Sequence, residues 1–256
     1  MNRVIPFLLV KDGGLVKTRQ FKDPTYVGDP INAIRIFNEK EVDELALLDI
    51  YASQEGRGPD FDLVSDVASE CFMPLAYGGG VRDLADAKRL FSLGVEKVIV
   101  RTAAANDLSV LTGIARFSGS QSVAVSVDLK KSRFGTLRIH APGTAIDGDA
   151  HWREFLRDAA AAGAGEIVLN FVDRDGTMGG MDTDAIAQAA QCLSTPLLAV
   201  GGVGSLADIR SGVDAGASAI GAGAFFVFHG QRRAVLITYP NYDELRNALG
   251  GHDARP

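Results

Sequence analysis

The sequence is short of the residues that build metal sites and disulfide frameworks. It contains only two cysteines, Cys71 and Cys192, which lie far apart, and four histidines without the spacing of metal ligands. We therefore expect two buried thiols and no disulfide. We also expect neither a metal nor another cofactor.

Membrane-spanning runs and clusters of basic residues are also missing. The apolar run at residues 4–10 ends in Lys11 and Asp12, without a small-residue cleavage pattern. It is too short to span a membrane and predicts a buried strand, so we expect a cytoplasmic protein without a membrane partner. The net charge of −6 and the absence of a basic cluster predict no nucleic acid partner.

One stretch of the chain occurs twice. Residues 74–104 align with residues 196–226 without a gap, at an offset of 122 residues, and each copy contains a pair of glycines. Each copy has the pattern of an apolar strand, a Gly-Gly turn, a helix and a second strand. The repeat predicts two similar halves, roughly residues 1–121 and 122–245.

Short apolar runs alternate with helical patterns along the whole chain. This strict alternation predicts one α/β domain over residues 1–256, a parallel (β/α)8 TIM barrel with a twofold half-barrel repeat. The expected strands are residues 4–10, 45–50, 73–77, 97–100, 122–127, 166–170, 196–200 and 217–222. The expected helices are residues 30–40, 61–70, 84–93, 108–117, 152–162, 183–192, 206–215 and 242–249.

Two segments between these elements are unusually long. Residues 11–29 are polar, include Lys17 and predict a functional or disordered loop. Residues 130–149 contain a short alternating run that predicts a small hairpin over the barrel mouth. In barrels of this kind the carboxyl ends of the strands carry the chemistry, so these segments border the expected site.

The two Gly-Gly turns, Gly79 with Gly80 and Gly201 with Gly202, indicate anion binding. Glycine lets the backbone turn sharply and approach a ligand closely. The helix after each turn points its N-terminal N–H groups at the turn, which favours phosphate. The pattern predicts two roughly symmetric phosphate cradles; tight turns without a ligand remain the alternative.

Charged residues mark both ends of the expected barrel. Arg3, Glu44, Lys97 and Glu166 each open a strand, and unpaired buried charge is costly, so they must pair with one another. They predict either a structural ion-pair plug or a gate on a passage through the barrel. Asp128 ends the fifth strand at the other face, as a candidate general acid–base group or a solvated strand-end residue.

These residues resemble the cyclase subunit of imidazole glycerol phosphate synthase, from histidine biosynthesis. The resemblance covers nearly the whole chain and rests on stretches such as IPFLLVKDG, YGGGV, EKVIVRTAA, GAGEIVLNFVDRDGT and VGGVGSLAD. It implies a (β/α)8 barrel that docks a glutaminase on its N-terminal face. Ammonia would then pass through the barrel to a bis-phosphorylated substrate at the C-terminal face.

The resemblance also implies roles for individual residues. The implied catalytic groups are Asp128 and Asp175, and the implied ammonia gate is Arg3, Glu44, Lys97 and Glu166. The implied phosphate and substrate ligands are Lys17, Gly79, Gly80, Arg101, Thr102, Asn170, Gly176, Thr177, Gly201, Gly202, Ala222 and Gly223.

Three substitutions depart from the family pattern. Leu9 stands where the family has its other catalytic aspartate, and it corresponds to Asp128 in the half-barrel repeat. Loss of a general acid–base group costs roughly 10²–10⁴-fold in rate. Arg101 and Asn170 replace the family's Asn and Thr, whereas the gate residues are unchanged.

These departures resemble a divergent branch of the family, which accompanies an N-acetyl sugar amidotransferase in surface-polysaccharide gene sets. The stretches KDPTYVGDPINAIRIFNEKEVDELALLDI, ASECFMPLAYGGG and FFVFHGQRRAVLITYP carry this likeness. It implies our leading hypothesis: a synthase subunit that docks a glutaminase and channels ammonia to a phosphorylated or nucleotide-sugar acceptor, for glycosyl amidation in polysaccharide biosynthesis. The sugar amidotransferase would be a further partner.

Two alternatives stay open. The first is an authentic cyclase of histidine biosynthesis, which forms imidazole glycerol phosphate and the aminoimidazole carboxamide ribotide. The second is a non-catalytic, phosphate-binding scaffold that activates a glutaminase.

Overall fold

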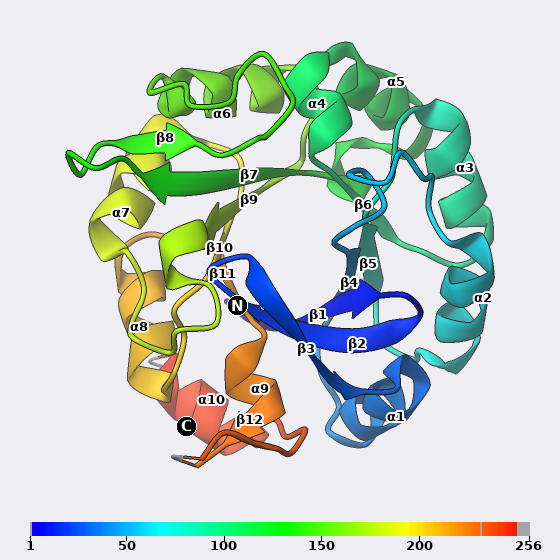
Figure 1. The fold of residues 1–256 in the computed structure, drawn as a ribbon, viewed down its shortest axis with the longest axis vertical. Coiled ribbons are helices and arrows are strands. Elements are labelled where there is room, and N and C mark those ends of the chain that lie inside the picture. Colours follow the sequence, from blue (N-terminus) through cyan, green and yellow to red (C-terminus); the bar gives the residue numbers. More distant parts are fainter. Residues whose placement is uncertain (1, 231, 250–256) are drawn as a thin grey trace, which may run out of the picture.

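Eight parallel strands close into a barrel in the computed structural model, which describes residues 2–230 and 232–249. β1 (Arg3–Lys11) pairs with β4 (Leu45–Asp49) on one side and with β11 (Ala219–Ala222) on the other, which closes the sheet. The strands between them, in barrel order, are β5 (Leu75–Gly78), β6 (Lys97–Val100), β7 (Val123–Lys131), β9 (Glu166–Phe171) and β10 (Leu197–Val200). Figure 1 looks into this barrel and shows the helices around it. The predicted (β/α)8 barrel is confirmed.

The outer helices begin and end within one residue of the expected positions. The first shows why: Asp29 caps the backbone N–H of Asn32, and Pro30 takes the first helical position, where its missing N–H costs nothing. The outer helices are α1 (Pro30–Glu39), α2 (Phe61–Glu70), α3 (Leu84–Ser92), α5 (Ser109–Ser118), α6 (Trp152–Ala161), α7 (Thr183–Cys192), α8 (Leu206–Asp214) and α10 (Tyr242–Ala248). Within the described ranges no helix is both long and apolar enough to cross a membrane.

The two halves of the chain repeat in the structure as well as in the sequence. Shifting α1, α2, α3, β5 and β6 by 122 residues gives the bounds of α6, α7, α8, β10 and β11 without a change at either end. The strand register repeats too. Leu9 lies opposite Leu48, and Asp128 lies opposite Asn170, which is 122 residues after Leu48. The predicted twofold half-barrel repeat is confirmed.

The segment after β1 is not the loop that its polar composition predicts. β2 (Gly14–Arg19) and β3 (Lys22–Gly28) form an antiparallel hairpin that continues from β1 and crosses the barrel mouth (Figure 1). Most of β3 is exposed, so its sequence is polar despite its extended backbone. The loop prediction for residues 11–29 was therefore wrong.

The second half contains the predicted hairpin, but it lies beside the barrel mouth rather than over it. β8 (Leu137–Ile139) pairs antiparallel with the end of β7, and the two project beside the barrel mouth (Figure 1). Two short helices were not expected: α4 (Thr102–Asn106) follows β6, and α9 (Ala224–Val227) follows β11. The remaining short elements are the 3-10 turns Ser120–Ser122 and Val172–Arg174 and the paired strands β12 (Phe228–His229) and β13 (Ala234–Val235).

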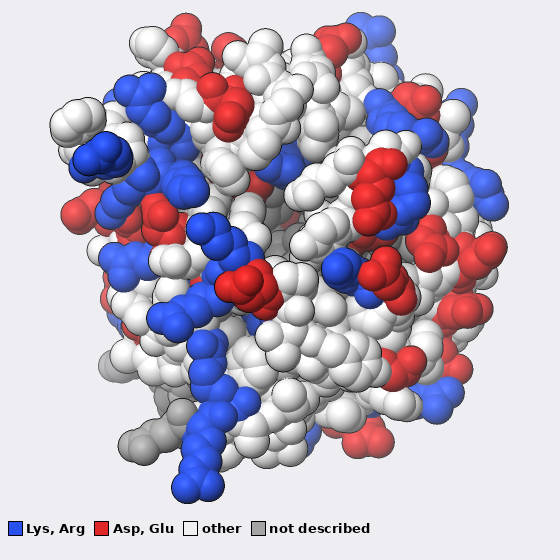
Figure 2. Space-filling view, in the orientation of Figure 1, with Lys and Arg blue, Asp and Glu red and all other residues white. Residues whose placement is uncertain are grey.

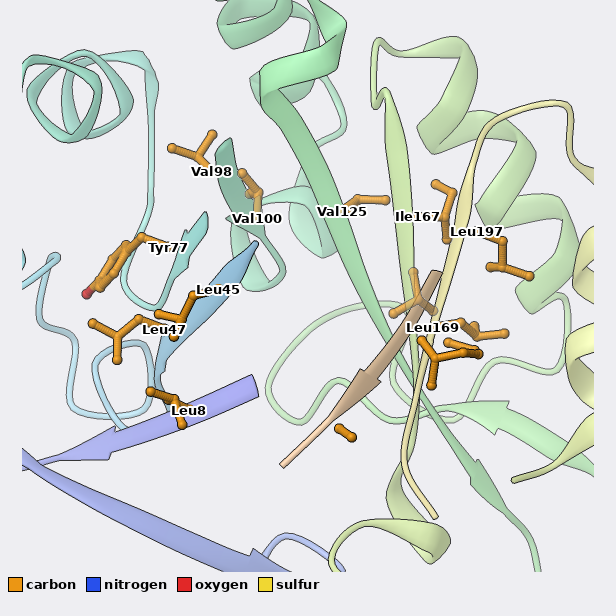
Figure 3. Packing of buried hydrophobic residues seen from close by; sticks show 14 of the residues in the cluster. Leu8, Leu45, Leu47, Tyr77, Val98, Val100, Val125, Ile167, Leu169 and Leu197 are labelled. Atoms are coloured by element: carbon orange, nitrogen blue, oxygen red, sulfur yellow. The ribbon is translucent and has the colours of Figure 1, made fainter. Parts of the chain in front are cut away.

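Alternation along the strands divides the core into two layers. One face of the barrel wall packs outward against the helices, and Figure 3 shows part of this larger layer, including Leu8, Leu47, Tyr77 and Ile167. The other face fills the interior with smaller side chains, because eight strands leave little room inside. The interior cluster is Ile5, Phe7, Ala46, Ala76, Ile99, Ala124, Val168, Leu198, Val200 and Ala219.

The two cysteines fit the expected free thiols only in part. Cys71 and Cys192 form no disulfide, but both are partly exposed rather than fully buried.

We expect Gly202→Ala to destabilise the fold more than Gly143→Ala. Both glycines have positive φ, 99° and 81°, so each alanine carries roughly 1–2 kcal/mol of left-handed strain. A Cβ at Gly202 would also lie 2.1 Å from the carbonyl oxygen of Gly180, whereas nothing lies within 4 Å of one at Gly143. This overpacking should lower the free energy of unfolding of Gly202→Ala by about 1–3 kcal/mol more than that of Gly143→Ala, as measured by urea unfolding. Equal losses in the two variants would contradict this account.

Candidate active site

The charged residues at the strand starts meet at the amino-terminal end of the barrel. Arg3 pairs with both Glu44 and Glu166. Lys97 Nζ lies 2.8 Å from Glu44 Oε1 and 2.7 Å from Glu166 Oε2. Both glutamates are buried, and each contacts both cations, so the ring leaves no charge unpaired. The predicted pairing is confirmed, while the role of a gate stays a prediction.

The other candidate residues lie at the opposite end, at or beyond the carboxyl ends of the strands. Figure 2 looks onto this end and shows a hollow near its centre, with Lys and Arg side chains along one side of it. β6, β7 and β9 bring Arg101, Asp128 and Asn170 to this mouth, and the β2–β3 hairpin brings Lys17. The remaining candidates follow their strands: Gly79 and Gly80 after β5, Thr102 after β6, Gly176 and Thr177 after β9, Gly201 and Gly202 after β10, and Gly223 after Ala222 of β11.

The Asp128 carboxylate is already held by a neighbouring side chain. Arg101 Nε lies 2.5 Å from Asp128 Oδ2, and Arg101 Nη2 donates a hydrogen bond to the carbonyl oxygen of His140 at 3.1 Å. Asn170 Nδ2 donates to Asp128 Oδ1 at 3.3 Å. Burial raises the pKa of Asp128, and the positive charge of Arg101 opposes that rise. The solvated strand-end alternative is wrong, because the side chain of Asp128 is only 4% exposed.

Leu9 takes the place that Asp128 takes in the other half. It is buried at the end of β1 and lies opposite Leu48, just as Asp128 lies opposite Asn170. At this repeated position the mouth therefore has an apolar side chain in one half and a carboxylate in the other.

Asp175, implied as a catalytic group, fixes the hairpin over the mouth. Its Oδ2 accepts hydrogen bonds from Thr18 Oγ1 at 2.6 Å and from the Phe21 N–H at 3.2 Å. Its Oδ1 lies 3.5 Å from Lys17 Nζ. The hairpin also packs closely on the neighbouring backbone, because a Cβ on Gly176 would lie 2.2 Å from the carbonyl oxygen of Thr18. A catalytic role for Asp175 stays a prediction. In the structure its carboxylate holds the β2–β3 hairpin in place.

The helices after the Gly-Gly turns offer fewer free N–H groups than expected. In α3, Asp83 Oδ1 accepts the N–H groups of Ala85 and Asp86. In α8, Ser205 caps the N–H of Asp208. The protein's own side chains therefore take some of the N–H groups at these N-termini, and the phosphate cradles stay a prediction.

A second repeated contact closes the same turns. Asp86 Oδ2 accepts the N–H of Arg82, and Asp208 Oδ2 accepts the N–H of Gly204 at the equivalent position. The repeated aspartates therefore stabilise the two turns from within the protein.

The short helices α4 and α9 have more open N-termini than α3 and α8. Within residues 2–230, no side chain caps either N-terminus, so their first N–H groups are available. A cation lies at each start. Arg101 precedes α4, and Lys17 Nζ lies over Gly223, where an added Cβ would come within 2.7 Å of it. Arg101 and Gly223 are repeat-related, 122 residues apart.

Sequence reasoning missed Thr18, His140 and both short helices. Thr18 is the neighbour of the candidate residue Lys17. Its role depends on the β2–β3 hairpin, which the polar composition of this segment does not predict. His140 contributes its backbone carbonyl to Arg101, and a carbonyl leaves no signal in a sequence.

The comparisons with known proteins agree on one family. Residues 3–232 match the family model described as "Histidine biosynthesis protein". The chain is 50% identical over 249 residues to a Pseudomonas aeruginosa protein named "Putative imidazole glycerol phosphate synthase subunit hisF2", covering 95% of this chain and 98% of that one. It is 46% identical over 246 residues to a Leptospira interrogans protein named "Putative imidazole glycerol phosphate synthase subunit HisF", covering 94% and 96%.

A third relative comes from Exiguobacterium sibiricum and is named "Imidazole glycerol phosphate synthase subunit HisF". It is 38% identical over 228 residues, 88% of this chain and 90% of its own. These names favour the imidazole glycerol phosphate synthase alternative over glycosyl amidation, which none of the three mentions.

We expect Thr18→Val to loosen the hairpin over the mouth. The variant keeps the shape of the side chain and removes the donor to the buried Asp175 carboxylate, a bond worth about 1.5–3 kcal/mol. Thr25→Val is the matched control on the exposed strand of the same hairpin, where a change within about 0.5 kcal/mol is expected. Urea unfolding measures the stability of both variants, and amide hydrogen exchange measures how well the backbone amides of β2 and β3 are protected in each. Equal protection in the two variants would show that Thr18 does not anchor the hairpin.

Proposed function

Because the chain belongs to the histidine biosynthesis protein family, we propose that it is the ammonia-using synthase subunit of a glutamine-dependent imidazole glycerol phosphate synthase. The observation that carries the proposal is the division of one barrel into two charged ends. A paired ring closes the amino-terminal end, and a mouth with two cations and two uncapped helix starts lies at the other. The names of the relatives, which call them subunits, support the assignment.

In this proposal a glutaminase docks on the face that carries Arg3, Glu44, Lys97 and Glu166 and releases ammonia there. Neutral ammonia could cross the barrel at little cost, whereas ammonium would be excluded by the apolar interior. The ring must then open, by movement of Lys97 or Arg3, to let ammonia pass. The alanines Ala46, Ala76, Ala124 and Ala219 keep the interior side chains small above the ring.

At the mouth a phosphorylated substrate binds with its anionic groups at the starts of α4 and α9. Arg101 and Lys17 supply positive charge at these two places, and the helix N-termini supply backbone N–H donors. Asp128, which accepts a hydrogen bond from Asn170 at the mouth, is the proposed general acid–base group. Since Leu9 cannot share the task, Asp128 has to act as both acid and base.

Glycosyl amidation remains a second candidate, favoured by Leu9 and by the ion pair of Arg101 with Asp128. Delivery of ammonia to an acceptor held by a further protein, such as an N-acetyl sugar amidotransferase, needs no acid–base group in this barrel. A mouth with one carboxylate missing and the other paired suits that task.

We expect the purified protein to convert the bis-phosphorylated histidine-pathway substrate with ammonium slowly, and Leu9→Asp to raise the rate. One general acid–base group contributes roughly 10²–10⁴-fold, so Asp128→Asn should lower the rate by a similar factor. The steady-state turnover rate is measured for the unmodified protein, Leu9→Asp and Asp128→Asn. No turnover by the unmodified protein, together with none in a Leu9→Asp, Arg101→Asn double variant, would reject the cyclase assignment and favour the second candidate.

We expect Phe72→Asp to weaken binding of a co-expressed glutaminase subunit, and Phe134→Asp to leave it unchanged. Phe72 is 85% exposed between α2 and β5, on the face of the ion-pair ring. Phe134 is 94% exposed at the tip of the β7–β8 hairpin, on the opposite face. Loss of an aromatic anchor typically costs about 2 kcal/mol or more, over tenfold in Kd by calorimetry. If Phe134→Asp weakened binding and Phe72→Asp did not, the glutaminase would dock on the face opposite the ion-pair ring, which would contradict the proposal.

A further inference from the structure

One polar atom at the mouth lacks a hydrogen-bond partner. Asn170 Oδ1 is buried and makes no hydrogen bond with any described residue. Asn170 and Arg101 both contact Asp128. Buried polar groups in folded proteins are nearly always satisfied, so Asn170 Oδ1 indicates a site that is incomplete without a ligand. The ligand has to bring a donor to Asn170 Oδ1.

Arg101 is the more exposed partner of its ion pair with Asp128. The side chain of Arg101 is 32% exposed, whereas that of Asp128 is 4% exposed. Arg101 Nε is close to the carboxylate at 2.5 Å but makes no aligned hydrogen bond with it. A guanidinium has five N–H donors in a planar fork, and the contacts with Asp128 and the His140 carbonyl use only some of them. The pair therefore holds the carboxylate and keeps donors for a second anion.

We propose that Arg101 is a specificity-determining latch, which holds Asp128 in the free protein and releases it when the anionic group of a ligand binds at the start of α4. The inference rests on the proposed phosphorylated ligand and names its chemistry more closely. A phosphate group carries up to two negative charges and accepts bidentate hydrogen bonds, so it can compete with a single carboxylate for the guanidinium. The ligand also carries an N–H or O–H group that donates to Asn170 Oδ1.

The release changes the protonation of Asp128. Burial raises the pKa of this carboxyl group, and Arg101 and His140 both oppose the rise. Burial lowers the pKa of His140, so near pH 7 that ring contributes little positive charge. Withdrawal of Arg101 therefore removes the main opposing charge, and the pKa of Asp128 rises further. A ligand without an anion at this place leaves Asp128 paired with Arg101.

Inorganic phosphate is the probe for the latch. In the full-length protein we would follow the backbone amides of Thr102 and Ala103 for binding and the Asp128 carboxyl carbon for its titration, both by NMR. Phosphate should move the Asp128 midpoint to higher pH in the unmodified protein. Arg101→Asn should show a raised midpoint without phosphate, a smaller further change on adding it, and affinity weakened by at least about tenfold.

Two further variants keep the test decisive. Arg210→Asn removes an arginine paired with Asp214 on the outer helix α8, and it should behave like the unmodified protein. Arg101→Lys keeps the positive charge without the planar fork and should bind phosphate with intermediate affinity. If Arg101→Asn does not fold, the phosphate affinity of Arg101→Lys is the test of the proposal.

Unchanged phosphate affinity and an unchanged Asp128 midpoint in the Arg101 variants would overturn the latch alone. No phosphate binding by the unmodified protein would overturn the latch together with the proposed ligand class. Glutaminase binding and turnover test the proposed function independently of this experiment.

Discussion

The closed parallel barrel constrains where every functional side chain can lie. All eight strands run in one direction, so their starts form one end and their carboxyl ends form the other. Since side chains alternate along a strand, every second residue faces the interior. Along β6 this row runs from Lys97 in the ring through Ile99 in the interior cluster to Arg101 at the mouth.

β9 repeats this arrangement with the row Glu166, Val168 and Asn170. The ion-pair ring and the mouth are thus the two ends of the same inward-facing rows. A register slip of one residue in either strand would turn both sets of candidate residues outward together. The closure of the barrel through β1 and β11 prevents such a slip, because each strand is paired on both edges.

Much of the scaffold could be predicted from the sequence because its signals are local or repeated. The outer helices have apolar periodicity and capping residues, such as Asp29 before Pro30. The offset of 122 residues predicted the repeat that the element bounds reproduce. The ring was predicted because charges at strand starts have to pair.

The rest depended on contacts that no local pattern records. β3 is exposed and polar, and α4 and α9 are too short for a helical period to be recognised. The pairing of Arg101 with Asp128 depends on how the end of β6 lies beside β7, which is known only once the strand register is known. The cap by Asp83 takes two N–H groups of α3 that were expected to be free.

The asymmetry of the mouth follows from the cost of buried charge. A carboxylate at position 9 would face Leu48, whereas Leu9 packs there without an electrostatic penalty. Asp128 is kept, and Arg101 compensates its burial. Leu9 and Arg101 therefore both lower the electrostatic cost of the mouth in the free protein. They also leave fewer acid–base groups freely available. Sites that carry out acid–base chemistry usually accept such a cost. A mouth that avoids it favours a reaction that begins only when a ligand's anion has taken Arg101 from Asp128.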